Sequence, residues 1–430
     1  MKPTLRCILL FLFACGLTPA HATTFRLDST KTWIRGTSYT YAPGDTFCLA
    51  AGKRPFQYFK GFHGSESKPL VIRNCAEGQA VVGKGTNYGM VLDSVTYIHL
   101  TGTGTPGVTY GIWLDSTAAG TGLGITNLSH HVEVDHLRIS HPNFAGIMAK
   151  KDYSGSPPDP APVMDGIHIH HNWIHDTGGE GMYLGETKSP GMLLTNLEVH
   201  HNLIQRTGWD LLQIANSVKN IRIHHNVMLD GGLAKEPVQA NGIQIGDQSR
   251  DVRIDHNIVK NVAENSLICM GSGSIVVDSN WFEGSGGKQA LFVDHRTFYD
   301  SGSTIRFSHN WWSRANTESV WRIYNEKVRI AMEDNLVESA PKLLVLTNGA
   351  TTANTDTLRT LRRTIAPLVF VDSAGGNFHI PTTSPYAAWD LGFGTSSDVS
   401  VLRTRRTQSF MNPLPTHDAL GRVWRGNGLW

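Results

Sequence analysis

Cysteine is scarce in this chain of 430 residues, which contains only five. Cys7 and Cys15 lie in the apolar N-terminal stretch, so three cysteines remain for the rest of the chain. Three are too few for a fold held together by disulfides, although one bridge can form in an oxidising compartment. Cys48 and Cys75 lie in two apolar segments 27 residues apart, and we expect these two to pair.

Charge is also low, because charged residues make up 17% of the chain and the formal net charge is only +2. No overall basic field therefore attracts nucleic acid. After the N-terminus, no apolar run is long enough to span a bilayer. We expect a monomer without a nucleic-acid partner or a transmembrane segment.

The N-terminus has the pattern of a secretory signal peptide. Lys2 and Arg6 precede a short apolar run, and the small residues Ala20 and Ala22 mark a cleavage site after Ala22. Cleavage as a lipoprotein, leaving lipid on Cys15, is a weaker alternative because the large Phe13 lies inside that site. The sequence thus predicts a periplasmic or secreted protein with a signal peptide at residues 1–22.

An asparagine recurs seven times in one local pattern. Apolar residues lie five and three positions before it and two positions after it, which predicts a strand with one buried face that turns at the asparagine. A second short strand follows each of the first six turns, at residues 182–184, 212–214, 243–245, 268–270, 291–293 and 321–323. The asparagines are Asn172, Asn202, Asn226, Asn257, Asn280, Asn310 and Asn335.

The asparagines are 23 to 31 residues apart, which is the length of one coil in a stacked repeat. The pattern therefore predicts an all-β fold, a single-stranded, right-handed parallel β-helix with an asparagine ladder. We expect it to span residues 23–395, with residues 396–430 as a C-terminal tail or cap.

This pattern resembles the pectate-lyase-like superfamily of right-handed parallel β-helix proteins, which are secreted carbohydrate-active proteins. The resemblance covers roughly residues 40–390, and residues 370–380 with Ser384 and Pro385 look like the final coil of many members. It implies that substrates bind on the first sheet, which here is the sheet of short strands. The superfamily includes lyases, hydrolases, epimerases and inert adhesins, so the motif indicates fold rather than chemistry.

Extra residues enter the repeat at 151–164, 186–195, 230–240 and 294–303, always beside the short-strand sheet. Long loops on both sides of a flat sheet form a groove, and a groove suits an extended polymer. The expected floor residues are Met148, Tyr183, Gln213, Gln244, Cys269, Phe292 and Arg322. The expected wall residues are Lys150, Lys151, Asp152, Glu180, Trp209, Asp210, Asn241, Asp247, His295 and Arg296.

The histidines before the asparagines do not predict a metal site. Stacked coils place His170, His200 and His224 in a row about 4.8 Å apart, whereas a metal ion needs ligands that converge on one point. Rows of this kind arise whenever a turn favours one residue, so we assign these histidines to the scaffold.

Two kinds of bond cleavage fit the groove. Elimination from a uronate needs a cation, for which Lys150, Arg296 or Arg322 are available, and a base, for which Lys150, Tyr183 or His295 are available. Hydrolysis needs two carboxylates, and Glu180 and Asp210 occupy equivalent positions on adjacent coils. Calcium is an optional cofactor, since Glu180, Asp210 and Asp247 show no calcium-binding signature.

The sequence therefore favours an exported polysaccharide lyase that cleaves an acidic glycan by β-elimination. A glycoside hydrolase using Glu180 and Asp210, and a non-catalytic glycan-binding surface protein, are the alternatives. The catalytic candidates are Lys150, Glu180, Tyr183, Asp210, His295 and Arg296. The substrate-binding candidates are Trp209, Gln213, Asn241, Gln244, Asp247 and Arg322.

Overall fold

The computed structural model describes residues 22–83, 88–115, 120–153, 155–187, 191–287, 289–294, 300–313, 318–338, 342–362 and 366–396. The expected signal peptide, up to residue 21, and the tail after residue 396 lie outside this part of the chain. Within it, no helix is long and apolar enough to cross a membrane.

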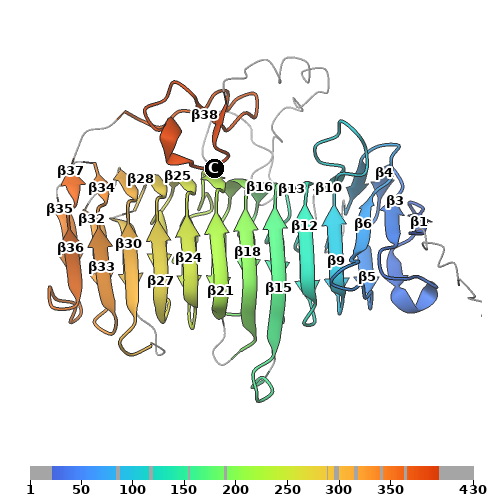
Figure 1. The fold of residues 1–430 in the computed structure, drawn as a ribbon, viewed down its shortest axis with the longest axis horizontal. Coiled ribbons are helices and arrows are strands. Elements are labelled where there is room, and N and C mark those ends of the chain that lie inside the picture. Colours follow the sequence, from blue (N-terminus) through green and yellow to red (C-terminus); the bar gives the residue numbers. More distant parts are fainter. Residues whose placement is uncertain are drawn as a thin grey trace, which may run out of the picture.

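Strands from successive coils pair in parallel to form three long sheets, here called A, B and C (Figure 1). Within the described residues, sheet A has thirteen strands: β1 (Thr24–Leu27), β3 (Thr46–Leu49), β6 (Leu70–Asn74), β9 (Thr96–Thr101), β12 (His130–Asp135), β15 (Val163–His170), β18 (Leu193–His200), β21 (Ser217–His224), β24 (Arg250–Asp255), β27 (Gly273–Asp278), β30 (Thr304–Ser308), β33 (Arg329–Glu333) and β36 (Thr355–Leu358).

Sheet B contains the short strands that the sequence predicted. Twelve described strands form it: β2 (Trp33–Arg35), β5 (Gln57–Lys60), β8 (Met90–Asp93), β11 (Leu123–Thr126), β14 (Ile147–Ala149), β17 (Met182–Leu184), β20 (Leu212–Ala215), β23 (Ile243–Gly246), β26 (Leu267–Cys269), β29 (Gln289–Asp294), β32 (Ser319–Tyr324) and β35 (Lys342–Leu346).

Sheet C follows the asparagine turns. In the described part of the chain it has twelve strands: β4 (Gly52–Arg54), β7 (Ala80–Val82), β10 (Ile112–Asp115), β13 (Leu137–Ser140), β16 (Trp173–Thr177), β19 (Leu203–Thr207), β22 (Val227–Leu229), β25 (Ile258–Val262), β28 (Trp281–Ser285), β31 (Trp311–Ser313), β34 (Leu336–Val337) and β37 (Leu361–Arg362).

Each full coil runs from sheet A to sheet C and then to sheet B. In Figure 1 the strands of sheet A lie in front and point upward, while the coils advance to the left, so the helix is right-handed. Right-handed crossovers are the rule between parallel strands. The predicted right-handed parallel β-helix is confirmed.

The asparagine ladder is also confirmed, since all seven predicted asparagines are buried. Each side-chain amide except the last donates to the Oδ1 atom of the next asparagine, as Asn226 Nδ2 does to Asn257 Oδ1 at 2.9 Å. The ladder begins at Asn172, whose Oδ1 accepts from the backbone N–H of Leu137. Leu137 therefore occupies the asparagine position in the preceding coil.

The histidines beside the ladder form stacked rows. Ring centroids of His170 and His200 are 4.7 Å apart, and those of His200 and His224 are 5.0 Å apart. A second row continues through His225 and His256 at 5.0 Å. This spacing is that of neighbouring coils, which agrees with the assignment of these residues to the scaffold.

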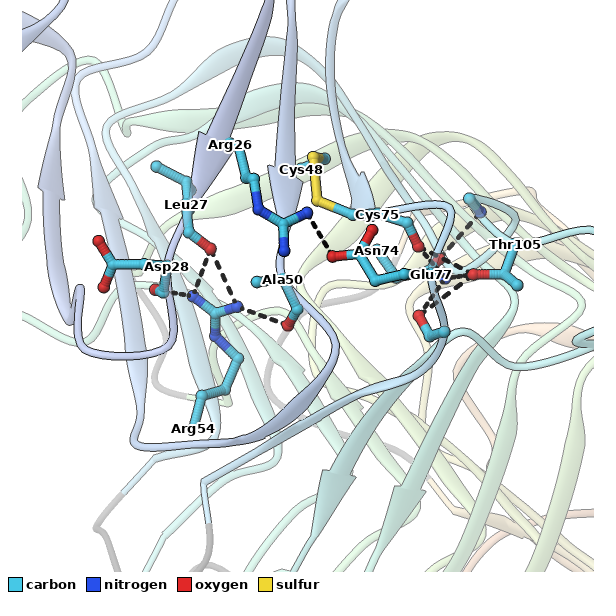
Figure 2. The surroundings of a disulfide bond; sticks show 12 residues. Arg26, Leu27, Asp28, Cys48, Ala50, Arg54, Asn74, Cys75, Glu77 and Thr105 are labelled. Atoms are coloured by element: carbon cyan, nitrogen blue, oxygen red, sulfur yellow. Dashed lines mark hydrogen bonds and ion pairs between the residues drawn. A yellow bond between two sulfur atoms is a disulfide. The ribbon is translucent and has the colours of Figure 1, made fainter.

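Cys48 and Cys75 form a disulfide near the first coils, with Cα atoms 4.9 Å apart (Figure 2). On the same end, the buried guanidinium of Arg54 donates to the backbone carbonyls of Leu27, Asp28 and Ala50. Leu27 and Asp28 lie at the end of β1, which is the first strand of sheet A among the described residues, and Ala50 follows β3 in the next coil. The disulfide and Arg54 thus hold the N-terminal end of the helix.

The segment expected to form a final coil does something else. Residues 366–396 add no strand to sheets A, B or C, and β38 (Ile380–Pro381) pairs only with β39 (Thr395–Ser396). Phe378 and Tyr386 pack instead against the outer face of sheet C, beside Trp281. Figure 1 shows this orange-red segment lying along the helix near β25 and β28.

Candidate active site

Parallel pairing in sheet B aligns one outward-facing residue from each strand into a continuous line, here called the floor row. Its members are Trp33, Tyr58, Val91, Gly124, Met148, Tyr183, Gln213, Gln244, Ile268, Phe292, Arg322 and Val345. Six of the seven predicted floor residues belong to it. The exception is Cys269.

Cys269 was wrongly predicted to face outward. It pairs with Ile245 and is fully buried, while Ile268 pairs with Gln244 and takes the floor position. The strand begins one residue earlier than expected, and a shift of one residue exchanges the two faces of a strand. Residues 267–270 are all apolar, so alternation gave no signal for the correct register.

Loops flank sheet B at both edges. Residues 230–242 connect β22 to β23 on one side, and residues 150–162 connect β14 to β15 on the other. Glu186 is buried, and its carboxylate accepts hydrogen bonds from the backbone N–H groups of Met192 (2.7 Å) and Tyr153 (3.3 Å). Glu186 therefore fixes two of the predicted insertions to each other.

Glu180 lies two residues before β17, at the edge of sheet B. Its side chain has no exposed surface, and neither carboxyl oxygen has a hydrogen-bond partner among the described residues. Burial raises the pKa of Glu180 to about 7, and the positive charge of Lys150 opposes part of that rise. A glutamic acid of this kind retains its proton close to neutral pH.

Asp210 occupies the equivalent position on the next coil and is equally buried. Its Oδ1 accepts hydrogen bonds from the backbone N–H of Asn241 at 2.7 Å and from Asn241 Nδ2 at 3.0 Å. The Gln244 amide lies 3.2 Å from Asp210 Oδ2 and donates to it when rotated to suit its surroundings. Burial raises the pKa of Asp210 to about 8, and the charge of Glu180 adds to the rise.

The carboxyls of Glu180 and Asp210 differ in how well their surroundings stabilise the ionised form. Burial raises the pKa of Asp210 further than that of Glu180, but Asp210 accepts hydrogen bonds from Asn241. No other described residue donates a hydrogen bond to Glu180, and only its own backbone N–H and the charge of Lys150 lower its pKa. Hydrogen bonds to the ionised form stabilise it. When the pair loses its first proton, we therefore place the charge on Asp210 and the remaining proton on Glu180.

Asn241 begins a second ladder along the edge of sheet B. Asn265 Nδ2 donates to Asn241 Oδ1 at 2.7 Å, and Gln289 Nε2 donates to Asn265 Oδ1 at 2.7 Å. All of these side chains are buried. The sequence had placed Asn241 in contact with substrate, whereas its amide is occupied by Asp210, so it is a positioning residue.

Lys150 and Tyr183 lie together on the outer face of sheet B. Lys150 Nζ is 4.1 Å from the centre of the Tyr183 ring and 3.0 Å from Asp152 Oδ1. The Tyr183 hydroxyl is hydrogen-bonded to Thr187 Oγ1. Gly185 follows Lys150 in the next coil, and its φ of +90° and a Cβ position only 1.9 Å from the Ala215 carbonyl oxygen require a glycine there.

Two half-buried aromatic side chains stand beside this pair. Phe144 and Trp209 lie on either side of Gly179, with ring centroids 5.5 Å apart in an edge-to-face arrangement. A side chain at Gly179 would collide with the Phe144 ring at 2.9 Å. The glycine before Glu180 is therefore required for this contact, which the sequence alone did not reveal.

The remaining predicted site residues do not join this cluster. Arg322 lies five strands beyond Tyr183 along the floor row, and its guanidinium is 3.7 Å from the Glu318 carboxylate. Asp247 is half-buried directly after β23. His295 and Arg296 lie outside the described residues. The structure thus brings together residues of four consecutive coils. They are Lys150, Glu180, Tyr183, Trp209, Asp210, Gln213, Asn241 and Gln244.

No predicted calcium ligand belongs to a metal-binding group in the described residues. The group found there consists of His99, Glu133 and Asp135, on the outer face of sheet A. Its members already form ion pairs, as His99 does with Asp135. Glu180, Asp210 and Asp247 do not form such a group.

A cavity of about 360 Å³ lies on a different side of the molecule. Gln205, Leu229 and Lys260 of sheet C line it, together with Phe370 and Phe378 of the C-terminal segment. None of the predicted site residues borders it. The chemistry-bearing side chains are therefore on sheet B and not at this cavity.

Comparison with known proteins gives no family assignment. No family model matches the chain, and no curated protein matches it. Solved structures similar to it include an alginate lyase from Paenibacillus sp. str. FPU-7, with 16% identity, a TM-score of 0.40, and coverage of 77% of this chain and 97% of that one.

Two further similar structures are the pectate lyase Pel9A and a lacto-N-biosidase from Eubacterium ramulus. The first has 11% identity, a TM-score of 0.45, and covers 88% of this chain and 94% of that chain. The second has 10% identity, a TM-score of 0.49, and covers 75% and 62%. The assignment of a parallel β-helix rests on the three sheets described above.

Proposed function

We propose that this chain is an enzyme that cleaves a polysaccharide lying over sheet B, with Glu180 as the proton donor. The observation that carries the proposal is the Glu180 carboxyl, which is fully buried, lacks a hydrogen-bond partner among the described residues and has its pKa raised to about 7. Buried carboxyls with raised pKa values are a common feature of acid–base catalysis.

The chemistry that these residues support best is glycoside hydrolysis. Glu180 gives its proton to the glycosidic oxygen as the bond to the anomeric carbon breaks, and water adds to that carbon. Asp210, ionised and hydrogen-bonded to Asn241, accepts the proton that this water loses. This favours the hydrolase alternative over the lyase that the sequence suggested.

The surroundings of the carboxyl pair suit a sugar substrate. Gln213 and Gln244 lie buried in the floor row beside the carboxyl pair, and Gln213 Oε1 has no hydrogen-bond partner among the described residues. Tyr183, Phe144 and Trp209 supply aromatic surface beside them. Aromatic faces with a few polar groups are typical of ligand sites.

β-Elimination is the second candidate, and the Lys150–Tyr183 contact favours it. A lysine ammonium 4.1 Å above a tyrosine ring combines a cation with a phenol that can donate or accept a proton. In this alternative, Lys150 neutralises a uronate carboxylate and Tyr183 transfers the proton. Hydrolysis and elimination give products that are easily distinguished.

Glu180→Gln and Asp210→Asn test the proposal. We expect each to lower kcat by at least about a hundredfold, because general acid–base catalysis contributes that much or more. Purified protein is incubated with polygalacturonate, alginate, hyaluronan and neutral glucans, and new reducing ends and ultraviolet absorbance are recorded. Glu283→Gln is the control, since Glu283 is a buried glutamate on sheet C.

New reducing ends without absorbance support hydrolysis, and absorbance from an unsaturated uronate supports elimination. In the second case Lys150→Ala, rather than Glu180→Gln, should abolish activity. The proposal is wrong if the Glu180 and Asp210 variants keep the activity of the Glu283 variant on every substrate that the native chain cleaves.

A further inference from the structure

The floor row does not end near the carboxyl pair but continues to an aromatic pair on the first coils, the exposed Trp33 and the half-buried Tyr58. Trp33 has 57% of its surface exposed, and its ring lies 4.4 Å from that of Tyr58. Phe56 contacts the same indole edge-to-face at 5.6 Å. Large exposed aromatic groups in one place mark an interaction surface.

Among the described residues, the floor row between this aromatic pair and Tyr183 has small or slender side chains. Val91, Gly124 and Met148 fill the three intervening positions of the floor row. A Cβ atom at Gly124 would meet only ordinary contacts, at 3.9 Å and beyond, so no side chain that the structure describes occupies its place. A chain lying over Tyr183 can therefore continue along sheet B to Trp33.

A basic row runs beside the aromatic pair. Arg35 and Lys60 are neighbours on β2 and β5, two positions from Trp33 and Tyr58, and both are exposed. The next residue of this row is Asp93, which is buried and bonded to Tyr58, Ser94 and Asn127 as well as to Lys60 at 3.3 Å. No ion pair involves Arg35 in the part of the chain that the structure describes, so Arg35 presents its full positive charge to solvent, while Lys60 shares its charge with Asp93.

Resting on the function proposed above, we infer that the N-terminal end of the floor row is a distal binding site for an acidic polysaccharide. A sugar ring packs on Trp33 and Tyr58, and its carboxylate lies against Arg35 and Lys60. The row continues toward Lys150, whose backbone N–H donates to Ile125, so positive groups recur on the same side of the bound chain. The substrate is thereby a polymer that contains uronate or similarly charged sugars.

The distance sets the length of substrate that uses this site. Five strand steps separate Trp33 from Tyr183, or roughly 24 Å at about 4.8 Å per step. Only an oligosaccharide of several sugar units reaches from the carboxyl pair to Trp33. Short substrates are therefore cleaved without this contact, and long ones gain affinity from it.

Trp33→Ala, Tyr58→Ala and the double variant Arg35→Gln/Lys60→Gln test this inference. Binding is measured by calorimetry with size-fractionated polygalacturonate, alginate and hyaluronan, each protein also carrying Glu180→Gln to prevent cleavage. We expect Trp33→Ala to weaken binding of the long fractions about five- to tenfold and to leave the shortest fractions unchanged. The double variant Arg35→Gln/Lys60→Gln should weaken binding of the long fractions more strongly at low salt than at high salt.

Leu361→Ala is the control, because Leu361 is 54% exposed on sheet C rather than sheet B. Unchanged binding of all three polymers by the Trp33 and Tyr58 variants overturns the inference, as does an equal loss in the Leu361 variant. Equal binding of a neutral glucan overturns the acidic specificity. The proposed function fails separately, through cleavage activity that survives Glu180→Gln.

Discussion

Glu180 is a residue whose burial lowers the stability of the folded protein. A buried carboxyl without a donor loses its hydration and gains no hydrogen bond in return, which costs free energy. Its neighbour Asp210 has two hydrogen bonds from Asn241. A scaffold alone gains nothing from the Glu180 arrangement, whereas a proton donor does.

The raised pKa of Glu180 predicts how stability changes with pH. The carboxyl ionises near 4.5 in the unfolded chain and near 7 in the folded protein, so between these values the folded state binds more protons. Stability from this group is therefore present at pH 5 and lost as pH rises toward 8. Over that range the native chain should lose about 2–3 kcal/mol more than Glu180→Gln in chemical unfolding. Equal losses would contradict the buried carboxyl.

The sequence predicted Glu180 and Asp210 because both lie three residues before a floor residue. It could not predict that Asn241 supports Asp210 instead of binding substrate, since that depends on which way an amide points in a turn. It also misplaced Cys269, because an all-apolar strand has no alternation to set its faces. The sequence also did not reveal Phe144 as part of the site, because its ring fits there only where residue 179 has no side chain.

Two polar ladders run along the helix in opposite senses. In the asparagine ladder each amide donates to the following coil, as Asn202 does to Asn226. In the ladder at the edge of sheet B each amide donates to the preceding coil, as Asn265 does to Asn241. The second ladder therefore directs its donors toward Asp210, at its acidic end.

Asn226→Leu tests the first ladder. Loss of the side chain removes the donor to the Val199 carbonyl and the acceptor of the Asn202 backbone N–H, so we expect the free energy of unfolding to fall by about 1–3 kcal/mol. Asn143→Leu is the control, since Asn143 is exposed. An unchanged melting temperature for Asn226→Leu would refute the role of the ladder.

Asn265→Leu tests the second ladder as a positioning device. Without the Asn265 amide, Asn241 is held less firmly and stabilises the Asp210 charge less well. We expect the lower pH limit of cleavage to shift upward, with little change in KM for short substrates. A lower melting temperature with an unchanged pH profile would show that the ladder is only structural.

At the scale of the whole molecule, the repeat made the architecture predictable but not its outer covering. A fixed spacing of apolar residues and asparagines determines how coils stack, because each coil contacts only its neighbours. Residues 366–396 have no repeat, and only the structure shows them covering the outer face of sheet C. Their resemblance to a final coil was misleading, since they contribute to none of the three long sheets.

Tyr386→Ala tests that covering. Tyr386 is buried, with its ring 4.6 Å from Trp281, so truncation should lower the free energy of unfolding by roughly 3–5 kcal/mol. Val369→Ala, at a residue 56% exposed in the same segment, should have little effect. Thermal and denaturant unfolding measure both, and equal stability of the two variants would contradict the proposed packing.

The most direct test is a crystal structure of Glu180→Gln with a long polygalacturonate or alginate oligosaccharide. We predict continuous sugar density along the floor row. A glycosidic bond should lie beside residue 180 and Asp210, and the oligosaccharide should run toward Trp33. Density in the cavity beside sheet C, or along the histidine rows of sheet A, with sheet B empty, would contradict it.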